Sequence, residues 1–179
     1  MLIQEYQESW VYDFNRIKRV IAEALSDIAI DIEHIGSTAV THLAAKPIID
    51  IDIAYSKDVD FEKIKAGLAQ LGYYHNGNQG IEDREVFKRR GVDAPHEVLD
   101  GINHHLYVCP IHSEELRKHI SFRNYLNAHE SERKEYESIK YAIAKEANQD
   151  KKTYALLKES KAKDFIESIL IKAGMNFTE

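Results

Sequence analysis

Cysteine, proline and tryptophan are scarce in this 179-residue chain, which has one cysteine, three prolines and one tryptophan. Cys109 has no partner for an internal disulfide, and we expect it to be a small buried strand residue. Eight glycines and three prolines are too few for a disordered or fibrous composition. The sequence therefore predicts a globular protein that needs no disulfide for its stability.

Long hydrophobic runs are lacking as well. The longest apolar stretch, residues 48–54, contains two aspartates and is far shorter than the roughly 20 residues of a membrane-spanning helix. The N-terminus does not have a basic segment followed by an apolar block, which is the pattern of a secretory signal. We therefore expect a cytoplasmic protein with no membrane partner.

Positive charge is in deficit, because 24 lysines and arginines stand against 30 aspartates and glutamates, for a net charge of -6. Binding along a nucleic acid backbone needs a dense basic surface that displaces counterions. This balance argues against a long nucleic acid as a partner, although local basic patches stay open. The hydrophobic fraction of 44% is sufficient for a real core in a chain of this length.

Up to residue 112, the sequence alternates between helix and strand patterns. Two segments have the three-and-four spacing of apolar residues that marks an amphipathic helix, 10–25 and 61–71. A shorter helix is expected over 39–45, which Pro47 stops. Four segments have the alternation or the composition of strands, namely 28–35, 48–55, 86–89 and 104–109. We expect an α+β fold with a small mixed β-sheet flanked by helices.

Beyond residue 112 the pattern becomes helical and is rich in Glu, Lys, Ala and Leu, with a break at 148–150. The α+β part and the helical part are not separated by a linker rich in Pro, Gly or Ser. We therefore expect a single domain over residues 1–179, in which 113–179 form a helical extension packed on an α+β core of 1–112. The oligomeric state is left open.

Asp50 and Asp52 are the first candidate site residues. They lie two positions apart on an expected strand, so both side chains leave the same face while isoleucines enter the other. Two such carboxylates repel each other, and a cation between them relieves the repulsion. Mg²⁺ is the natural cation, because it prefers oxygen ligands and usually takes one or two carboxylates with water and phosphates. The alternative is two exposed acids on an edge strand.

Gly36 and Ser37 are the second candidate element, because they lie between an expected strand and an expected helix. Free backbone N–H groups and the helix dipole favour phosphate at such a turn. Ser37 can cap the helix or bond a phosphate oxygen, and Lys46 can add a charge nearby. The alternative is a simple turn with a serine cap.

Gly36-Ser37 is followed after twelve residues by Asp50-Ile51-Asp52-Ile53. This arrangement resembles the signature of the nucleotidyltransferase superfamily. The longer strings at 34–40 and 43–51 are similar to those of the GrpB family, whose members are predicted nucleotidyltransferases. The likeness covers nearly the whole chain and continues through Arg84, Phe87, residues 104–108, residues 122–126, Tyr136, Lys140, Tyr154 and Lys158.

The resemblance implies a nucleotidyltransferase-like fold and a site that holds Mg²⁺ and a nucleoside triphosphate. The acid pair would hold the metal and the Gly-Ser turn the phosphates, while an acceptor hydroxyl attacks the α-phosphorus and pyrophosphate leaves. The expected phosphate or acceptor partners in the helical extension are Arg123, Lys140 and Lys158. Each can equally be an ordinary solvated helix residue, and Lys161 competes with Lys158.

A third carboxylate, which many superfamily enzymes use to activate the acceptor, is not evident at 103–107. An imidazole can serve as base or metal ligand there, and of His104 and His105 we take His105 as the catalytic candidate. Polar residues hydrogen-bonded at a strand end are an equal interpretation. The other acids that could supply the missing oxygen are Glu85, Glu97 and Asp100. The chain also departs from the family pattern at Thr41, His42 and Tyr107.

Three functions are compatible with these residues. The first is a Mg²⁺-dependent enzyme that moves a nucleoside monophosphate from a nucleoside triphosphate to an unknown small-molecule or protein acceptor. The second is a catalytically inactive nucleotide-binding module of the same fold, which would release no pyrophosphate. The third is a metal hydrolase that uses histidines without a recognised zinc spacing, namely His96, His104, His105 and His112.

Overall fold

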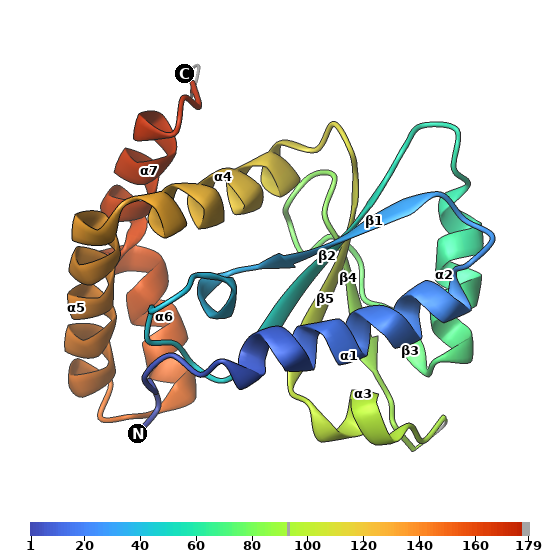
Figure 1. Ribbon diagram of the computed structural model, residues 1–179, viewed down its shortest axis with the longest axis horizontal. Helices are drawn as coiled ribbons and strands as arrows, with labels where there is room; N and C mark the ends of the chain where they lie inside the picture. The colour runs from blue at the N-terminus through green and yellow to red at the C-terminus, as the bar shows by residue number, and fades with distance from the viewer. Residues whose placement is uncertain (93, 177–179) are drawn as a thin grey trace.

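The computed structural model describes residues 1–92 and 94–176, which form a five-stranded sheet with helices packed against it (Figure 1). The strands are β1 (Ile30–Ile35), β2 (Ile49–Tyr55), β3 (Tyr73–His75), β4 (Glu85–Arg89) and β5 (His104–Pro110). The helices are α1 (Ser9–Ala24), η1 (Ser37–Ala39, a 3-10 turn), α2 (Phe61–Gln70), α3 (Glu97–Gly101), α4 (Glu114–Ala128), α5 (Glu130–Glu146), α6 (Lys151–Lys161) and α7 (Lys163–Lys172). The predicted α+β fold with a helical C-terminal portion is confirmed.

The sheet has the strand order β1-β2-β5-β4-β3. Strands β2 and β5 run parallel and the other neighbours antiparallel, so the sheet is mixed, as predicted. The register places Asp52 of β2 between Glu33 of β1 and Tyr107 of β5. Strand β2 is therefore a central strand with a neighbour on each side.

Alternation along β2 sorts its side chains between two faces of the sheet. The isoleucines at 49, 51 and 53 are buried in a core that also takes residues from α1, α2 and α3. Asp50 and Asp52 leave the opposite face. Helix α4 lies over that face, because His119 reaches Asp52 and Arg123 reaches Glu33. The carboxylates thus lie between the sheet and the first helix of the extension.

Helices α4 to α7 group together at one side of the sheet (Figure 1). Their apolar residues, including Leu126 and Tyr136, form a second core with the N-terminus and the segment after η1, to which Leu2 and Leu43 contribute. The amide of Leu2 donates to Gln149 Oε1 at 2.8 Å, which ties the N-terminus to the loop between α5 and α6. The extension therefore shares its core with N-terminal residues.

Helix starts follow local capping rules. The side chain of Asp60 accepts from Glu62 N before α2, and Ser113 accepts from Leu116 N before α4. Asp150 accepts from the Thr153 amide before α6, so the break predicted at 148–150 is confirmed. Such caps satisfy amide groups that have no partner within the helix.

The short helix expected after η1 does not form, and its residues are irregular but largely buried. Their backbone groups find partners in distant segments instead. Ala45 N donates to Gln4 O at 2.8 Å, and Ala44 N donates to Glu137 Oε2 at 2.7 Å. Tertiary hydrogen bonds replace the helical ladder here. The elements β3 and α3 were not predicted, because each is too short to show a periodicity.

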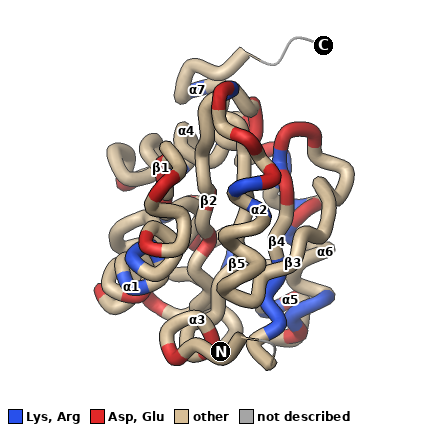
Figure 2. Tube along the Cα trace, turned by 90° about the vertical axis from the view of Figure 1, so that its right-hand side faces the viewer, with Lys and Arg blue, Asp and Glu red and all other residues tan. Residues whose placement is uncertain are grey.

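The outer surface carries charges of both signs. In the view of Figure 2, positions of Lys and Arg are interspersed with positions of Asp and Glu. None of the described helices combines the length and the apolar composition needed to cross a lipid bilayer.

Candidate functional site

Asp50 and Asp52 form an acid pair on one face of β2, as the alternation predicted. The Asp50 side chain is 28% exposed, whereas Asp52 is completely buried. The alternative of two exposed acids on an edge strand is therefore wrong. A buried carboxylate needs hydrogen bonds or a compensating charge, and each member of the acid pair has an imidazole as its partner.

His105 is the partner of Asp50, because the parallel register of β2 and β5 sets these residues opposite each other. Its Nδ1 donates to Asp50 Oδ1 at 2.8 Å. The carboxylate thus orients the ring and, in the neutral tautomer, leaves Nε2 as a hydrogen-bond acceptor. The ring is 54% exposed, so a ligand can reach it.

His119 of α4 is the partner of Asp52, and we did not predict it. Its Nδ1 donates to Asp52 Oδ2 at 2.7 Å, and its Nε2 lies 3.4 Å from Glu115 Oε1. Burial acts to lower the pKa of His119, but the hydrogen bonds to Asp52 and Glu115 outweigh it and raise the pKa to about 9. An imidazolium therefore compensates the buried carboxylate. The spacing of Glu115 and His119 puts both on one helix face, but nothing in the sequence showed that this face meets the sheet.

The Gly36 turn comes into direct contact with the acid pair. Gly36 has φ +72° and ψ -168°, a conformation that is essentially restricted to glycine. A Cβ atom at this position would overlap Asp50 Oδ2 and lie 3.1 Å from Asp50 Cβ. The backbone can approach the carboxylate this closely only because the side chain is missing. Ser37, the next residue, begins η1.

Buried residues anchor the turn. Thr38 Oγ1 donates to the carbonyl of Ile48 at 3.2 Å and lies 3.0 Å from His34 Nε2. The His34 ring stacks on Phe14 with 4.6 Å between ring centroids. Burial is the main cause that lowers the pKa of His34 to about 4. A neutral histidine thus supports the turn from the core.

Lys46 and Lys158 are brought together near Asp50. The Lys46 ammonium lies 4.3 Å from the ring centroid of Tyr154. Burial lowers the pKa of Lys46, the charge of Lys158 lowers it further, and Asp50 opposes both. The phenol of Tyr136 raises the pKa of Lys158, and Asp50 acts in the same direction. Both lysines interact electrostatically with Asp50, and together they create a positive region at the Asp50 end of the acid pair.

Arg123 and Lys140 have protein partners. The Arg123 guanidinium donates to Glu33 Oε2 at 2.6 Å and to the carbonyl of His34 at 2.8 Å, so it holds the end of β1. Lys140 is buried and donates to the carbonyl of Ala44. Burial lowers the pKa of Lys140 to about 7. The phosphate contacts that the resemblance implies for these two residues stay predictions.

The acids considered as a third carboxylate lie away from the acid pair. Glu85 is opposite Val108 in the register, on the other face of the sheet, and pairs with His75. Asp100 pairs with Arg89 at 2.9 Å. Glu97 belongs to the first turn of α3, on the side of the isoleucine core. Two other carboxylates approach the acid pair: Glu115 through His119, and Glu33, which is opposite Asp52 in the register and is held by Arg123.

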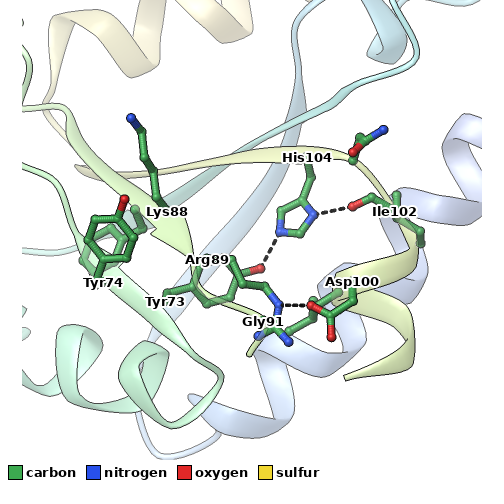
Figure 3. A pocket seen from close by; sticks show the side chains of 11 residues that line it. Tyr73, Tyr74, Lys88, Arg89, Gly91, Asp100, Ile102 and His104 are labelled. Carbon is green, nitrogen blue, oxygen red and sulfur yellow. Dashed lines mark hydrogen bonds and ion pairs between the residues drawn. The ribbon is translucent and has the colours of Figure 1, made fainter. Parts of the chain in front are cut away.

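A hollow of about 400 Å³ lies beside the start of β5, on the side opposite the acid pair (Figure 3). His104 points into it, and its Nδ1 donates to the carbonyl of Ile102 at 2.7 Å. The hydroxyl of Tyr73 then donates to Nε2 at 2.5 Å. His104 and His105 therefore face opposite sides of the sheet, and His105 is the one that meets the acid pair.

The histidines considered for a metal hydrolase do not gather at one place. His96 caps α3 by accepting from Val98 N, and His112 lies 4.0 Å from Asp83 on the surface. Within residues 1–92 and 94–176, no group of three or more His, Cys, Asp or Glu side chains is placed to hold a metal ion. The histidines of the hydrolase interpretation are therefore not brought together among the described residues.

A hollow of about 370 Å³ opens at the start of β5, between the N-terminus and the segment that leads into β2. His105 and Lys46 belong to its lining, together with Lys151 of α6 and Gln4 near the N-terminus. Two lysines and an exposed imidazole suit an anionic ligand. The hollow therefore adjoins the candidate site through His105 and Lys46.

The GrpB protein family model matches residues 1–172 of the chain. Glutamate-rich protein GrpB of Alkalihalophilus pseudofirmus is 32% identical over 173 residues, which cover 95% of this chain and 94% of that protein. UPF0157 protein YqkA of Bacillus subtilis is 30% identical over 139 residues, which cover 78% of this chain but 38% of that protein.

A solved structure shares the fold. The crystal structure of conserved protein GrpB from Enterococcus faecalis matches with a TM-score of 0.77 at 25% sequence identity, over 97% of this chain and 99% of that chain. Neither this description nor the names of the two relatives state an activity or a substrate.

Proposed function

The chain belongs to the GrpB family, and for this member we propose a Mg²⁺-dependent nucleotidyl transfer at the acid pair and the Gly36 turn. The enzyme would move a nucleoside monophosphate from a nucleoside triphosphate to the hydroxyl of a small molecule or a protein. The observation that carries the proposal is the packing of Gly36 against Asp50, which joins a phosphate-binding type of turn to a metal-binding type of acid pair.

Asp50, the more exposed member of the acid pair, would be the first ligand of Mg²⁺. His105 uses Oδ1 of Asp50, and Oδ2 lies toward the Gly36 turn. Asp52 would be the second ligand, although His119 holds its Oδ2. Because Mg²⁺ usually takes one or two carboxylates, the phosphates of the substrate and water would complete its shell. Bound there, the metal would neutralise charge on the phosphate oxygens.

Side chains of the protein would stabilise the triphosphate and accept the proton of the acceptor. Lys46 and Lys158 supply positive charge to the triphosphate, since both lie at the Asp50 end of the acid pair. His105, oriented by Asp50, accepts the proton of the acceptor hydroxyl at Nε2. The hydroxyl oxygen bonds to the α-phosphorus, the bond from that phosphorus to the bridging oxygen breaks, and pyrophosphate leaves.

Replacing Asp50 by Asn tests the site. The amide keeps an oxygen for His105 but loses the charge that a metal and its triphosphate require. We expect calorimetric titration of ATP, GTP, CTP and UTP with Mg²⁺ to show binding to the wild-type protein for at least one of them. The affinity of Asp50→Asn for that nucleotide should be lower by about tenfold or more.

Asp31→Asn is the matched control, because it removes the same charge from an exposed position on the neighbouring strand β1. It should bind the nucleotide like the wild type, and circular dichroism should show that both variants are folded. Equal affinity of Asp50→Asn and wild type, or no binding by either, would rule out the proposed site.

A nucleotide-binding module without turnover is the second candidate. It is favoured by the pairing of Asp52 with the His119 imidazolium, since this carboxylate already has a compensating charge. Pyrophosphate release in the presence of candidate acceptors separates the two. For an enzyme, His105→Gln should keep nucleotide binding and slow pyrophosphate release on the order of 10²- to 10⁴-fold. Binding without any release by the wild type would favour the module.

A further inference from the structure

Arg84 has no role in the site described so far, yet it lies beside it. Arg84 directly precedes β4, and its guanidinium carbon lies 5.0 Å from the ring centroid of Tyr107. Tyr107 is opposite Asp52 in the parallel register of β2 and β5. The guanidinium therefore flanks the Asp52 end of the acid pair, across β5.

The guanidinium lacks an anionic partner in the part of the chain that the structure describes. Arg84 Nε is buried and without a hydrogen-bond partner among residues 1–92 and 94–176. The nearby carboxylates of Asp52 and Glu115 are both directed to His119. A buried donor without a partner is costly, and a guanidinium matches the paired oxygens of a phosphate or a carboxylate.

The pKa values of neighbouring residues agree with a position of Arg84 beside Asp52. Burial raises the pKa values of Tyr107 and Cys109, and the positive charge of Arg84 acts to lower both. The hydrogen bond to His119 is the main cause that lowers the pKa of Glu115, and Arg84 acts in the same direction. These residues surround Asp52 on the sheet and on α4. The protein thus places a cation on the side of the acid pair that lies away from the Gly36 turn, while Lys46 and Lys158 serve the Asp50 end.

We propose that Arg84 binds an anionic group, a phosphate or a carboxylate, of the acceptor. The inference rests on the proposed function, because it divides one site between two substrates. The triphosphate lies at the Gly36 turn and the lysines, and the acceptor lies across β5 beside Tyr107. The acceptor is therefore a molecule that carries both a hydroxyl and an anionic group.

Inorganic phosphate, and acetate in a second series, serve as probes of this subsite. We expect phosphate or acetate to bind the wild-type protein when Mg²⁺ and its nucleotide are already bound. The affinity for that anion should fall about tenfold or more in Arg84→Gln, as for loss of a charged hydrogen bond. The nucleotide affinity of this variant should stay within about twofold of the wild type.

Lys63→Gln is the matched control, since it removes a positive charge from an exposed position on α2, which packs into the isoleucine core on the other face of the sheet. It should leave both affinities unchanged. Absence of anion binding by the wild type, or an unchanged affinity in Arg84→Gln, would overturn the proposal. A loss of nucleotide affinity in Arg84→Gln would assign the arginine to the triphosphate and overturn it as well. Failure of the proposed function shows separately, as equal nucleotide binding by the wild type and Asp50→Asn.

Arg84→Met gives an independent readout. Methionine can keep a contact with the Tyr107 ring, and it removes the unpartnered donor. If Arg84 is kept for a ligand, the melting temperature of the free protein should be no lower than that of the wild type. A drop of several degrees would show that the guanidinium supports the fold without a ligand and would overturn the inference.

Discussion

His34 is buried and the His119 side chain is only 23% exposed, yet the pKa values of the two residues move in opposite directions. His34 faces an apolar ring and a hydroxyl, so burial dominates and its pKa falls to about 4. His119 faces Asp52 and Glu115, whose hydrogen bonds outweigh burial and raise its pKa to about 9. A carboxylate from β2 and another from α4 therefore keep His119 protonated near neutral pH.

The raised pKa of His119 predicts a loss of stability at alkaline pH. The folded value of about 9 lies above the unfolded value of 6.5, so the stabilisation is complete below pH 6.5 and is lost as the pH rises through 9. Its size is up to about 3 kcal/mol. Urea unfolding of the wild type at pH 6 and pH 9.5 should show this loss, which His119→Gln should lack.

His119→Gln leaves Asp52 buried without a compensating charge, so this variant should be less stable than the wild type at pH 6 by about 3–5 kcal/mol. Asp52→Asn/His119→Gln, in which neither partner is charged, should recover part of that loss. If wild type and His119→Gln had the same pH dependence of unfolding, the ion pair with Asp52 would not exist in solution.

The turn between β1 and η1 depends on the backbone conformation of Gly36. Gly36→Ala should destabilise the protein by about 1–3 kcal/mol, because alanine is strained at this φ and ψ. It should also displace Asp50, with which the new methyl group would overlap. We therefore expect the affinity for Mg²⁺-nucleotide to fall about tenfold or more, measured by calorimetry next to urea unfolding.

Gly80→Ala separates the two effects. Gly80 also has a positive φ, of +82°, but nothing lies within 4 Å of the position that a Cβ atom would take. This variant should lose stability through backbone strain and keep the nucleotide affinity of the wild type. Equal affinity in Gly36→Ala would mean that contact between the turn and Asp50 has no part in binding.

On the scale of the whole molecule, the two cores should unfold together. Trp10, the one tryptophan, lies in the core under the sheet, whereas most buried apolar residues of the helical extension belong to the second core. Because Leu2 and Leu43 join that second core, the helical extension does not have a complete core alone. Urea unfolding followed by tryptophan fluorescence and by far-ultraviolet circular dichroism should give coincident transitions.

Leu126→Ala provides the test variant. The Leu126 side chain is completely buried in the second core, so the substitution should lower the free energy of unfolding by about 2–5 kcal/mol. Both probes should shift together to lower urea. A shift in dichroism alone, with an unchanged tryptophan transition, would show that the helical extension is an independent unit.

Local patterns in the sequence were sufficient to predict much of the fold. Alternation in β2 predicted the isoleucine face and the acid pair, and the capping residue Asp150 marked the break before α6. The segment after η1 had the spacing of a helix but is irregular, because Gln4 and Glu137 supply its hydrogen bonds. Partners so distant in the chain leave no trace in local periodicity.

The sequence by itself determined the α+β class, the common face of Asp50 and Asp52 and the glycine turn, because each follows from bond geometry within a few residues. Only the tertiary structure decided that His105 orients Asp50, that His119 compensates Asp52 and that Arg84 lies across β5 without an anionic partner among the described residues. These relations join residues from separate strands and from α4, and strand register and helix packing set them.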